Sequence, residues 1–382
     1  MLFELDEEKK LFRSTVRDFA EKVIRPRVEE LWEGGEFPYD IVKQMGEMGL
    51  FGIPYPEEYG GSGGDYLAYS IAVEELARLD GAIAITVEAH TSLGESSFYY
   101  FGTEEQKQKW LVPMAQGKML GAFGLTEPEA GSDAGATRTT ARLENGQWVI
   151  NGTKCFITNA GTDITGGVTV TAVTGVKDDG RKEISTIFVP NGTPGYTIAP
   201  KYHKVGWHAS DTRELHFDDC RVPEENLVGV RGEGFKQFLS ILDGGRIAIA
   251  ALAVGQSQGA FEEALRYAKE RKQFGRPIGS FQAIAFKLAD MATNIELARN
   301  LTYKAAAMRD AGVPHSKEAA MAKLFASEAN MRNVTEAVQI FGGYGFMNEY
   351  AVSRFFRDAK ILEIGEGTSE VQRMVISRAL GL

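Results

Sequence analysis

Cysteine is scarce in this chain. Its 382 residues include only Cys155 and Cys220, which form no CxxC pair. Disulfide frameworks and thiolate metal sites need several cysteines at short spacing, so we expect two unpaired, buried thiols in a reducing compartment. The 5 histidines show no HExxH or similar spacing. We therefore predict no metal site.

The familiar nucleotide and nucleophile motifs are also missing. No GxGxxG follows an expected strand, and neither a Walker A sequence nor a GxSxG occurs. These absences argue against a nicotinamide Rossmann site, a P-loop and a hydrolase nucleophile elbow. A dinucleotide would have to be bound in another way.

Positive charge is in deficit, with 42 Lys and Arg against 52 Asp and Glu and a net charge of -10. Such a field repels nucleic acid and anionic membranes. The acidic N-terminus contains no apolar targeting stretch, and no uninterrupted apolar run reaches the roughly 18 residues of a membrane span. We expect a cytoplasmic protein, most simply bacterial, with no nucleic-acid partner and no membrane insertion.

The apolar pattern divides the chain into three parts, an α+β arrangement of two or three lobes. Up to about residue 117 the pattern is helical: Asp6 is a candidate N-cap of a helix that runs to Pro26, and Thr103 with Gln106 has the form of a capping box. Short β-branched runs follow and predict a small antiparallel β domain. The last part is helical again. Its stretch from Arg246 is apolar on both sides, which predicts a buried bundle core and a subunit interface.

One carboxylate near the C-terminus, Glu366, stands between two glycines in the sequence ILEIGEGTSEVQR. Flanking glycines allow close approach to a ligand. A carboxylate in an apolar pocket has a pKa raised towards neutrality, where it abstracts protons efficiently, so Glu366 is our candidate base. The same residues also fit an ordinary helix start on an exposed loop, with Thr368 as cap, Glu370 in the first turn and Glu366 as a solvated charge.

Two segments of the central part offer groups for a cofactor. In GLTEPEAGSDAG, residues 124–135, a strand runs into a loop that presents Leu125 and Thr126; a plain turn explains the composition equally well. In TKCFITN, residues 153–159, strand alternation puts Phe156 and Thr158 on one face. That face could cover a planar cofactor, or it could be one side of a half-buried strand.

Two charged segments are open to two interpretations as well. Arg271, in RKQFGRPIGSFQ, offers a planar fork suited to pyrophosphate oxygens, although Arg271 and Lys272 also fit a solvated helix end. Asp243 and Arg246, in ILDGGR, could be a ligand-binding pair or an exposed ion pair at a helix start.

These segments, together with QIFGGYGFMNEYAVSRFFRDAK at residues 339–360, occur in an order that closely resembles the acyl-CoA dehydrogenase family of flavoproteins, from Leu5 to Leu380. The resemblance implies an N-terminal helical domain (1–117), a middle β domain (118–228) and a C-terminal four-helix bundle (229–382). It implies a homotetramer, a dimer of dimers, with FAD as cofactor. It also implies acyl-CoA as substrate and an electron-transferring flavoprotein as electron acceptor.

The resemblance also implies residue roles. Glu366 would remove the α-proton while the β-hydrogen leaves as hydride, and Arg271 would bind the FAD pyrophosphate of a neighbouring subunit. The family often has Trp where this chain has Phe156. The implied FAD contacts are Phe123, Leu125, Thr126, Ser132, Phe156, Ile157, Thr158, Arg271, Phe274, Gln282, Gln339, Gly342, Gly343, Thr368 and Glu370. The implied acyl-CoA contacts are Ser132, Asp243, Arg246 and Gly367.

Some branches of the family carry the base near the position of Gly245 and lack one in the C-terminal loop. Here Gly244 and Gly245 are both glycine and Glu366 is present, which favours Glu366. The EGTSE and ILDGGR sequences best match short-chain and short-branched-chain members, and hence fatty-acid or branched amino-acid degradation. Alternatives with this fold are a flavin oxidase or oxygenase and a non-catalytic CoA-binding protein, and Glu366 speaks against both.

Overall fold

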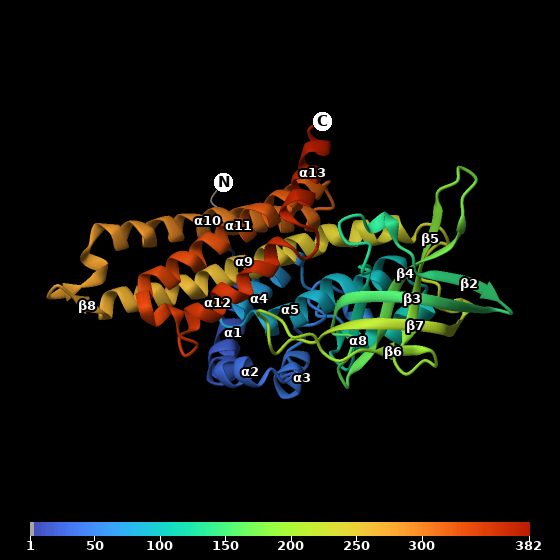
Figure 1. Cartoon of the computed structure of the whole chain (residues 1–382), viewed down its shortest axis with the longest axis horizontal. Coiled ribbons are helices and arrows are strands. Elements are labelled where there is room, and N and C mark those ends of the chain that lie inside the picture. Colours follow the sequence, from blue (N-terminus) through green and yellow to red (C-terminus); the bar gives the residue numbers. More distant parts are fainter. Residues whose placement is uncertain (1–3) are drawn as a thin grey trace.

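The computed structural model describes residues 4–382 and has the order helices, sheet, helices (Figure 1). Asp6 accepts a hydrogen bond from Lys9 N at 2.7 Å, and Thr103 and Gln106 form a complete capping box, so both predicted helix starts are confirmed. The N-terminal helices are α1 Glu7–Phe19, α2 Val28–Gly34, α3 Tyr39–Glu47, α4 Tyr66–Ala77, α5 Gly81–Glu88, α6 Ser96–Phe101, α7 Glu104–Gln106 and α8 Val112–Ala115.

The first helical segment does not stop at Pro26 as the sequence suggested. After α1 the backbone continues through a π-helical turn, Ala20–Ile24, and a 3-10 turn, Arg25–Arg27, into α2. Pro26 lies at the start of the 3-10 turn, where its missing N–H breaks no helical hydrogen bond. The proline therefore changes the helix type without ending it.

The middle of the chain forms one sheet in the order β1-β4-β2-β3-β7-β6, with β5 also paired to β4. The predicted antiparallel sheet is mixed around β4, because β1 pairs with β4 in parallel and β2 does so at one bridge. Residues 125–164 between β1 and β4 are long enough for the crossover that parallel pairing requires. The strands are β1 Leu120–Gly124, β2 Thr140–Glu144, β3 Gln147–Thr158, β4 Thr165–Val176, β5 Lys182–Pro190, β6 Tyr196–Ile198 and β7 Thr212–Pro223.

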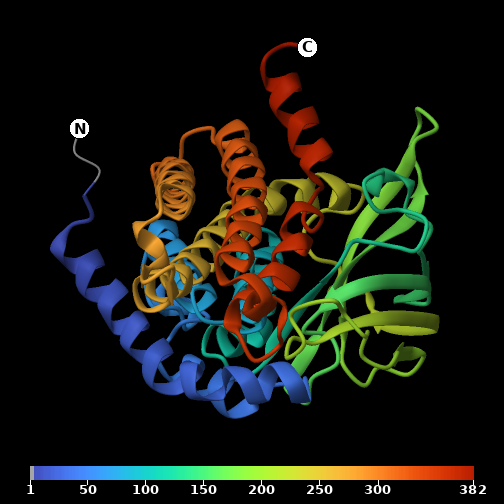
Figure 2. The ribbon, with the colours of Figure 1, turned by 60° about the vertical axis from the view of Figure 1, so that its left-hand side comes forward.

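The C-terminal part is a bundle of long helices, and Figure 2 shows the sheet along one side of the molecule and α13 projecting from its body. The long helix α9 begins at Gly234, so Asp243 and Arg246 do not lie at a helix start. The elements are α9 Gly234–Glu270, the hairpin β8 Lys272–Gln273 and β9 Arg276–Pro277, α10 Gln282–Asp310, α11 Ser316–Phe341, α12 Ala351–Ala359 and α13 Ser369–Ala379.

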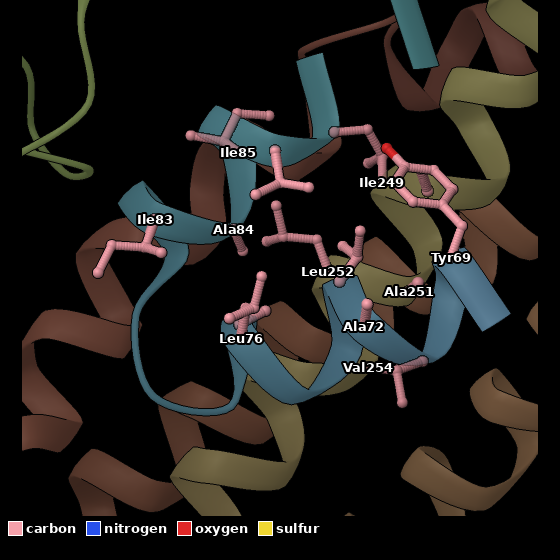
Figure 3. Packing of buried hydrophobic residues seen from close by; sticks show 14 of the residues in the cluster. Tyr69, Ala72, Leu76, Ile83, Ala84, Ile85, Ile249, Ala251, Leu252 and Val254 are labelled. Carbon is pink, nitrogen blue, oxygen red and sulfur yellow. The ribbon is translucent and has the colours of Figure 1, made fainter. Parts of the chain in front are cut away.

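Helix α9 is the centre of the largest core. Its side chains pack against α4 and α5, and Leu76, Ile85 and Leu252 lie close together there (Figure 3). Residues 244–257 of α9 are buried on every side, as predicted for an all-round apolar stretch, whereas residues 261–270 are partly exposed. By length and composition α9 could cross a membrane, but 83% of its most apolar window is buried inside the protein, as in the core helix of a globular domain.

Candidate active site

Glu366 lies in the turn between a 3-10 helix, Lys360–Glu363, and α13. The expected helix start is real: Thr368 caps α13 by accepting a hydrogen bond from Val371 N at 3.3 Å, and Glu370 is exposed in its first turn. The expectation of a solvated Glu366 is nevertheless wrong. The residue is half-buried, and within residues 4–382 its buried oxygen Oε2 has no hydrogen-bond partner.

The inward direction of Glu366 depends on an unusual backbone. Its φ is 52°, in the left-handed region that residues with a Cβ rarely adopt, and Gly367 follows at 93°. Lys323 Nζ donates to Gly367 O at 2.7 Å, while Gln372 Nε2 donates to Gly367 O at 2.8 Å and to Glu366 O at 3.3 Å. These hydrogen bonds hold the turn in place.

The carboxyl group of Glu366 lies directly against Gly245 of α9. A Cβ built on Gly245 would overlap Oε2 of Glu366 and lie 2.9 Å from its Cδ and 3.1 Å from Leu93 Cδ2. A side chain at position 245 and the side chain of Glu366 would therefore occupy the same space. Positions 245 and 366, the two candidate positions for the base in the sequence, therefore place a side chain at the same point in the fold.

The electrostatics favour a base that titrates near neutrality. Burial raises the pKa of Glu366 to about 7, although the neighbouring Glu88 carboxyl and the positive charges of Lys323 and Arg246 lower it. Burial, and then the charge of Glu366, raise the pKa of the Glu88 carboxyl well above its usual range, and Ser92 Oγ donates to Glu88 Oε1 at 2.7 Å. The two buried carboxyl groups interact, so ionisation of one disfavours ionisation of the other.

An apolar cluster borders the carboxyl group. Leu93 belongs to a buried group with Ile241 and Leu242, against which Phe123 and Leu125 pack. The predicted base and two predicted flavin residues thus meet at one cluster. On the other side of Gly245, a Cβ built on Gly244 would lie 2.8 Å from Tyr66 Oη and 2.7 Å from Arg309 Nη1.

The loop after β1 is held by a buried ion pair that we did not predict. Lys154 Nζ lies 2.7 Å from Glu127 Oε1 and donates to Leu125 O at 3.2 Å, while Cys155 N donates to Thr126 O at 2.9 Å. Burial lowers the pKa of Lys154 to about 8. Burial opposes ionisation of Glu127, but Lys154 and the loop donors hold its pKa near 2. The loop is fixed at its base, and Ser132 is exposed near its tip.

Phe156 and Thr158 do not lie in a regular strand. Phe156 has φ 61°, and the register with β7 slips between Lys154 and Ile157. The irregularity interrupts the alternation before Phe156, but from Phe156 to Thr158 the side chains alternate as we assumed. Phe156 is still 66% exposed and Thr158 half-buried, whereas the Ile157 side chain is buried in the sheet, so Ile157 offers only its backbone to a ligand.

A second group of predicted cofactor residues lies at the far end of the bundle. Arg271, Gly342 and Gly343 line a groove of about 530 Å³, and the Arg271 guanidinium lies 5.6 Å from the ring of Tyr344. Gln282, Gln339 and the hairpin residue Phe274 are exposed around this end. Figure 1 shows β8 at one end of the molecule and the sheet at the other. One chain therefore does not bring its two groups of predicted cofactor residues together.

Asp243 and Arg246 are not an exposed pair at a helix start. Both lie inside α9, Arg246 is buried, and its Nη1 donates to Asp243 Oδ1 at 2.6 Å. Asp243 also accepts from Ser316 Oγ at 3.0 Å. The pair links α9 to α11 beside Glu366, which explains how the Arg246 charge acts on that carboxylate.

A carboxylate base beside an apolar cluster is suited to removing a proton from carbon, which is the chemistry of an enzyme. Three family models match consecutive parts of it: acyl-CoA dehydrogenase, N-terminal domain, at residues 6–118; middle domain, at 122–220; and C-terminal domain, at 232–381. The chain belongs to the acyl-CoA dehydrogenase family. It is an oxidoreductase that acts on the CH–CH bond of an acyl-CoA, as we predicted.

Similar proteins agree over their whole length. The probable acyl-CoA dehydrogenase YngJ of Bacillus subtilis is 57% identical, and the alignment covers 100% of both chains. The short-chain specific acyl-CoA dehydrogenase of Clostridium acetobutylicum is 51% identical, with 99% of both chains covered.

Two solved structures are equally similar in fold. Butyryl-CoA dehydrogenase from Megasphaera elsdenii has a TM-score of 0.96 and 46% identity, with 100% of both chains covered. A chain from a structure described as the electron transferring flavoprotein of Acidaminococcus fermentans has a TM-score of 0.96 and 49% identity, covering 100% of this chain and 99% of that one. The predicted three-domain fold class is confirmed, while the boundaries at 117 and 228 stay predictions.

FAD is the cofactor of this family, and the residues present fit it. A Cβ on Gly131, Gly342 or Gly343 would meet nothing within 4 Å, so these backbone positions are open to a ligand. The groove beside the two later glycines carries the Arg271 guanidinium, which suits a pyrophosphate. The exposed Phe156 ring offers a flat apolar surface at the sheet.

Proposed function

We propose that this enzyme dehydrogenates a short-chain acyl-CoA, straight or branched, to the trans-2-enoyl-CoA and passes the electrons to an electron-transferring flavoprotein, in fatty-acid or branched amino-acid degradation. The observation that carries the proposal is the Glu366 carboxyl, buried against Gly245 with a pKa of about 7. A base of this kind removes a proton efficiently from a carbon next to a thioester.

In this proposal Glu366 accepts the α-proton, and bound FAD supplies the acceptor for the β-hydrogen. Glu88 is buried beside Glu366, and this burial and the charge of Glu366 raise the pKa of Glu88 and favour its protonated form. The acidity of the α-carbon rises when donors surround the thioester oxygen, and the family resemblance assigns the backbone N–H of Glu366 to that role. The hydrogen-bonded pair of Arg246 and Asp243 inside α9 is proposed to contact the acyl-CoA, as the resemblance implies.

The short chain length is supported by the surroundings of Glu366 and by the relatives. Leu93, Tyr66 and Glu88 lie close to the carboxyl or to the glycines beneath it, which restricts the room for a long acyl tail. The relative from Clostridium acetobutylicum is named as short-chain specific, and the neighbour from Megasphaera elsdenii as a butyryl-CoA dehydrogenase. The electron acceptor is supported by the neighbour from the Acidaminococcus structure.

A panel of acyl-CoAs tests this function. On anaerobic mixing, butyryl-CoA or a short branched acyl-CoA is expected to bleach the flavin band fastest. Palmitoyl-CoA is expected to be at least about tenfold slower, because its added methylenes must find room beside Leu93 and Tyr66. Fast bleaching by palmitoyl-CoA would contradict the short chain length. Bleaching by no acyl-CoA would contradict the function. Oxygen uptake in an aerobic repeat tests the oxidase alternative.

The separation of the two cofactor groups supports a site shared between chains. FAD bound at the sheet of one chain does not reach the Arg271 groove of the same chain, since they lie at opposite ends (Figure 1). Phe274 and Phe346 near that groove are 93% and 83% exposed, and α13 projects from the body (Figure 2). A homotetramer, a dimer of dimers, would cover these exposed aromatic side chains.

Replacing Arg271 by Ala is therefore expected to weaken FAD binding by about tenfold to a hundredfold, the loss of a charge-assisted hydrogen bond, and to shift the assembly towards smaller species. Fluorescence titration with FAD and light scattering measure the two effects. The neighbouring Lys272→Ala removes a charge from the same exposed hairpin without touching the groove and serves as the control. A fully active monomer would contradict the shared site.

A further inference from the structure

The buried lysine of α11, Lys323, has no role in the function proposed so far. Its side chain is 0% exposed and is among the largest that are fully buried. Burying an ammonium group is costly unless its charge is used, and burial lowers the pKa of Lys323 to about 8. A cation kept in such a place needs a physical reason.

Hydrogen bonding alone does not supply that reason. Lys323 Nζ donates to Gly367 O at 2.7 Å, but the neutral amide of Gln372 donates to the same oxygen at 2.8 Å. A carbonyl with one good neutral donor does not need a buried ammonium as its second. Lys323 differs from Gln372 in its positive charge. Its ammonium group binds the carbonyl of Gly367, the residue that follows Glu366 in the chain.

The groups that face Glu366 come from several elements. Helix α5 contributes Glu88, α9 contributes Arg246 and α11 contributes Lys323, while the aromatic hydroxyls of Tyr66 and Tyr69 come from α4. Glu363 and Glu370 flank the turn and act on Lys323 from outside. Of these groups, Lys323 alone combines a positive charge with a hydrogen bond to the turn that carries Glu366.

We propose that Lys323 is a positioning residue for Glu366: it holds the strained turn through Gly367, and its charge favours the ionised form of the carboxyl that accepts the proton. The inference rests on the proposed role of Glu366 as the base. Lys323 and Gln372 both donate to the carbonyl of Gly367 and so both hold the turn. Only Lys323 adds a positive charge.

The charge has a definite effect on pH dependence. A base works in its ionised form, which is present above its pKa, so activity is lost as the pH falls through that value. Removing a nearby positive charge disfavours the ionised form and raises the pKa of Glu366 further. The acid limb of the activity, which follows the pKa of Glu366, then moves to higher pH.

Three variants separate charge from geometry when single-turnover bleaching by butyryl-CoA is followed against pH. Lys323→Met is expected to move the acid midpoint up by on the order of one unit, which makes the reaction about tenfold slower near pH 6, and to approach the unmodified enzyme at alkaline pH, where Lys323 loses its own charge. Lys323→Arg keeps the cation and is expected to keep the midpoint. Gln372→Met removes the neutral donor and is expected to lower the rate without moving the midpoint.

An unchanged midpoint in Lys323→Met, or an equal shift in Gln372→Met, overturns the inference and leaves Lys323 a structural residue. If Lys323→Met does not fold, Lys323→Gln, which retains an amide donor without charge, takes its place under the same criteria. Glu366→Gln measured in parallel distinguishes a failure of the proposed base from a failure of the proposed role of Lys323. Full activity in Glu366→Gln removes the proposed role of Glu366 as the base, whereas an inactive Glu366→Gln with an unshifted Lys323→Met removes only the role of Lys323.

Discussion

Replacing Glu366 by Gln is expected to slow flavin bleaching by butyryl-CoA by about 10²- to 10⁴-fold, the usual contribution of a general base. The amide keeps the shape of the carboxyl group, and the bonds that hold the turn go to the backbone carbonyls of residues 366 and 367. Binding of FAD and acyl-CoA should therefore change little, so the loss appears in kcat more than in KM. Stopped-flow bleaching and FAD titration measure the two effects.

Glu363→Gln is the matched control, because Glu363 belongs to the same stretch of chain but pairs with Lys360 at the surface. The half-buried Glu363 carboxylate acts on Lys323 but is not among the charges that act on Glu366, so we expect this variant to retain most of its bleaching rate. If Glu366→Gln also reduces its flavin at nearly the normal rate, Glu366 is only a loop charge and the base must be another residue.

A single methyl group at position 245 is expected to have the second largest effect. In Gly245→Ala the added Cβ would overlap the carboxyl oxygen of Glu366, and α9 cannot move aside because it is buried along this stretch. The carboxyl must shift instead, and a misplacement of roughly 1 Å costs about 10²-fold in rate. Alanine is a better helix former than glycine by about 1 kcal/mol, so the thermal midpoint of unfolding should not fall.

The same contact allows a test by relocation. Gly245→Glu combined with Glu366→Gln brings a carboxylate to the same space from α9. Gly245→Glu combined with Glu366→Gly does the same and also removes the side chain with which the new glutamate would clash. Some activity is expected to return in these double variants. A normal kcat in Gly245→Ala would contradict the confined position of Glu366, and the relocation experiment would then lose its basis.

Much of the fold follows from local patterns in the sequence. The caps at Asp6 and Thr103, the helix–sheet–helix order and the buried α9 depend on short-range signals, and the structure confirms them. The parallel pairing of β1 with β4 could not be predicted in this way. The two strands are separated by residues 125–164, and no short-range pattern specifies which distant strand pairs with β1. The helical path through Pro26 likewise depends on packing that overrides a local stop signal.

The candidate base was visible in the sequence, but its environment was not. Two glycines around Glu366 marked it, whereas its inward direction depends on Lys323 and on Gly245, which are distant in the chain. The sequence around the other buried charges is ordinary. Glu88 and Lys323 lie in regular helix patterns, Lys154 lies in a strand pattern, and its partner Glu127 lies in a loop. No local signal distinguishes such residues from surface charges, because their burial is a property of the assembled fold.

Since the Arg271 groove and the sheet lie at opposite ends of one chain (Figure 1), folding and completion of the proposed shared cofactor site are separate events. A newly made chain can bury its α9 core alone, but it gains a complete pair of cofactor surfaces only on meeting a second chain. At low expression, folded chains would increase in proportion to synthesis, whereas finished sites would increase with roughly the square of chain concentration, as mass action requires. Dilution would then remove activity before it removes structure.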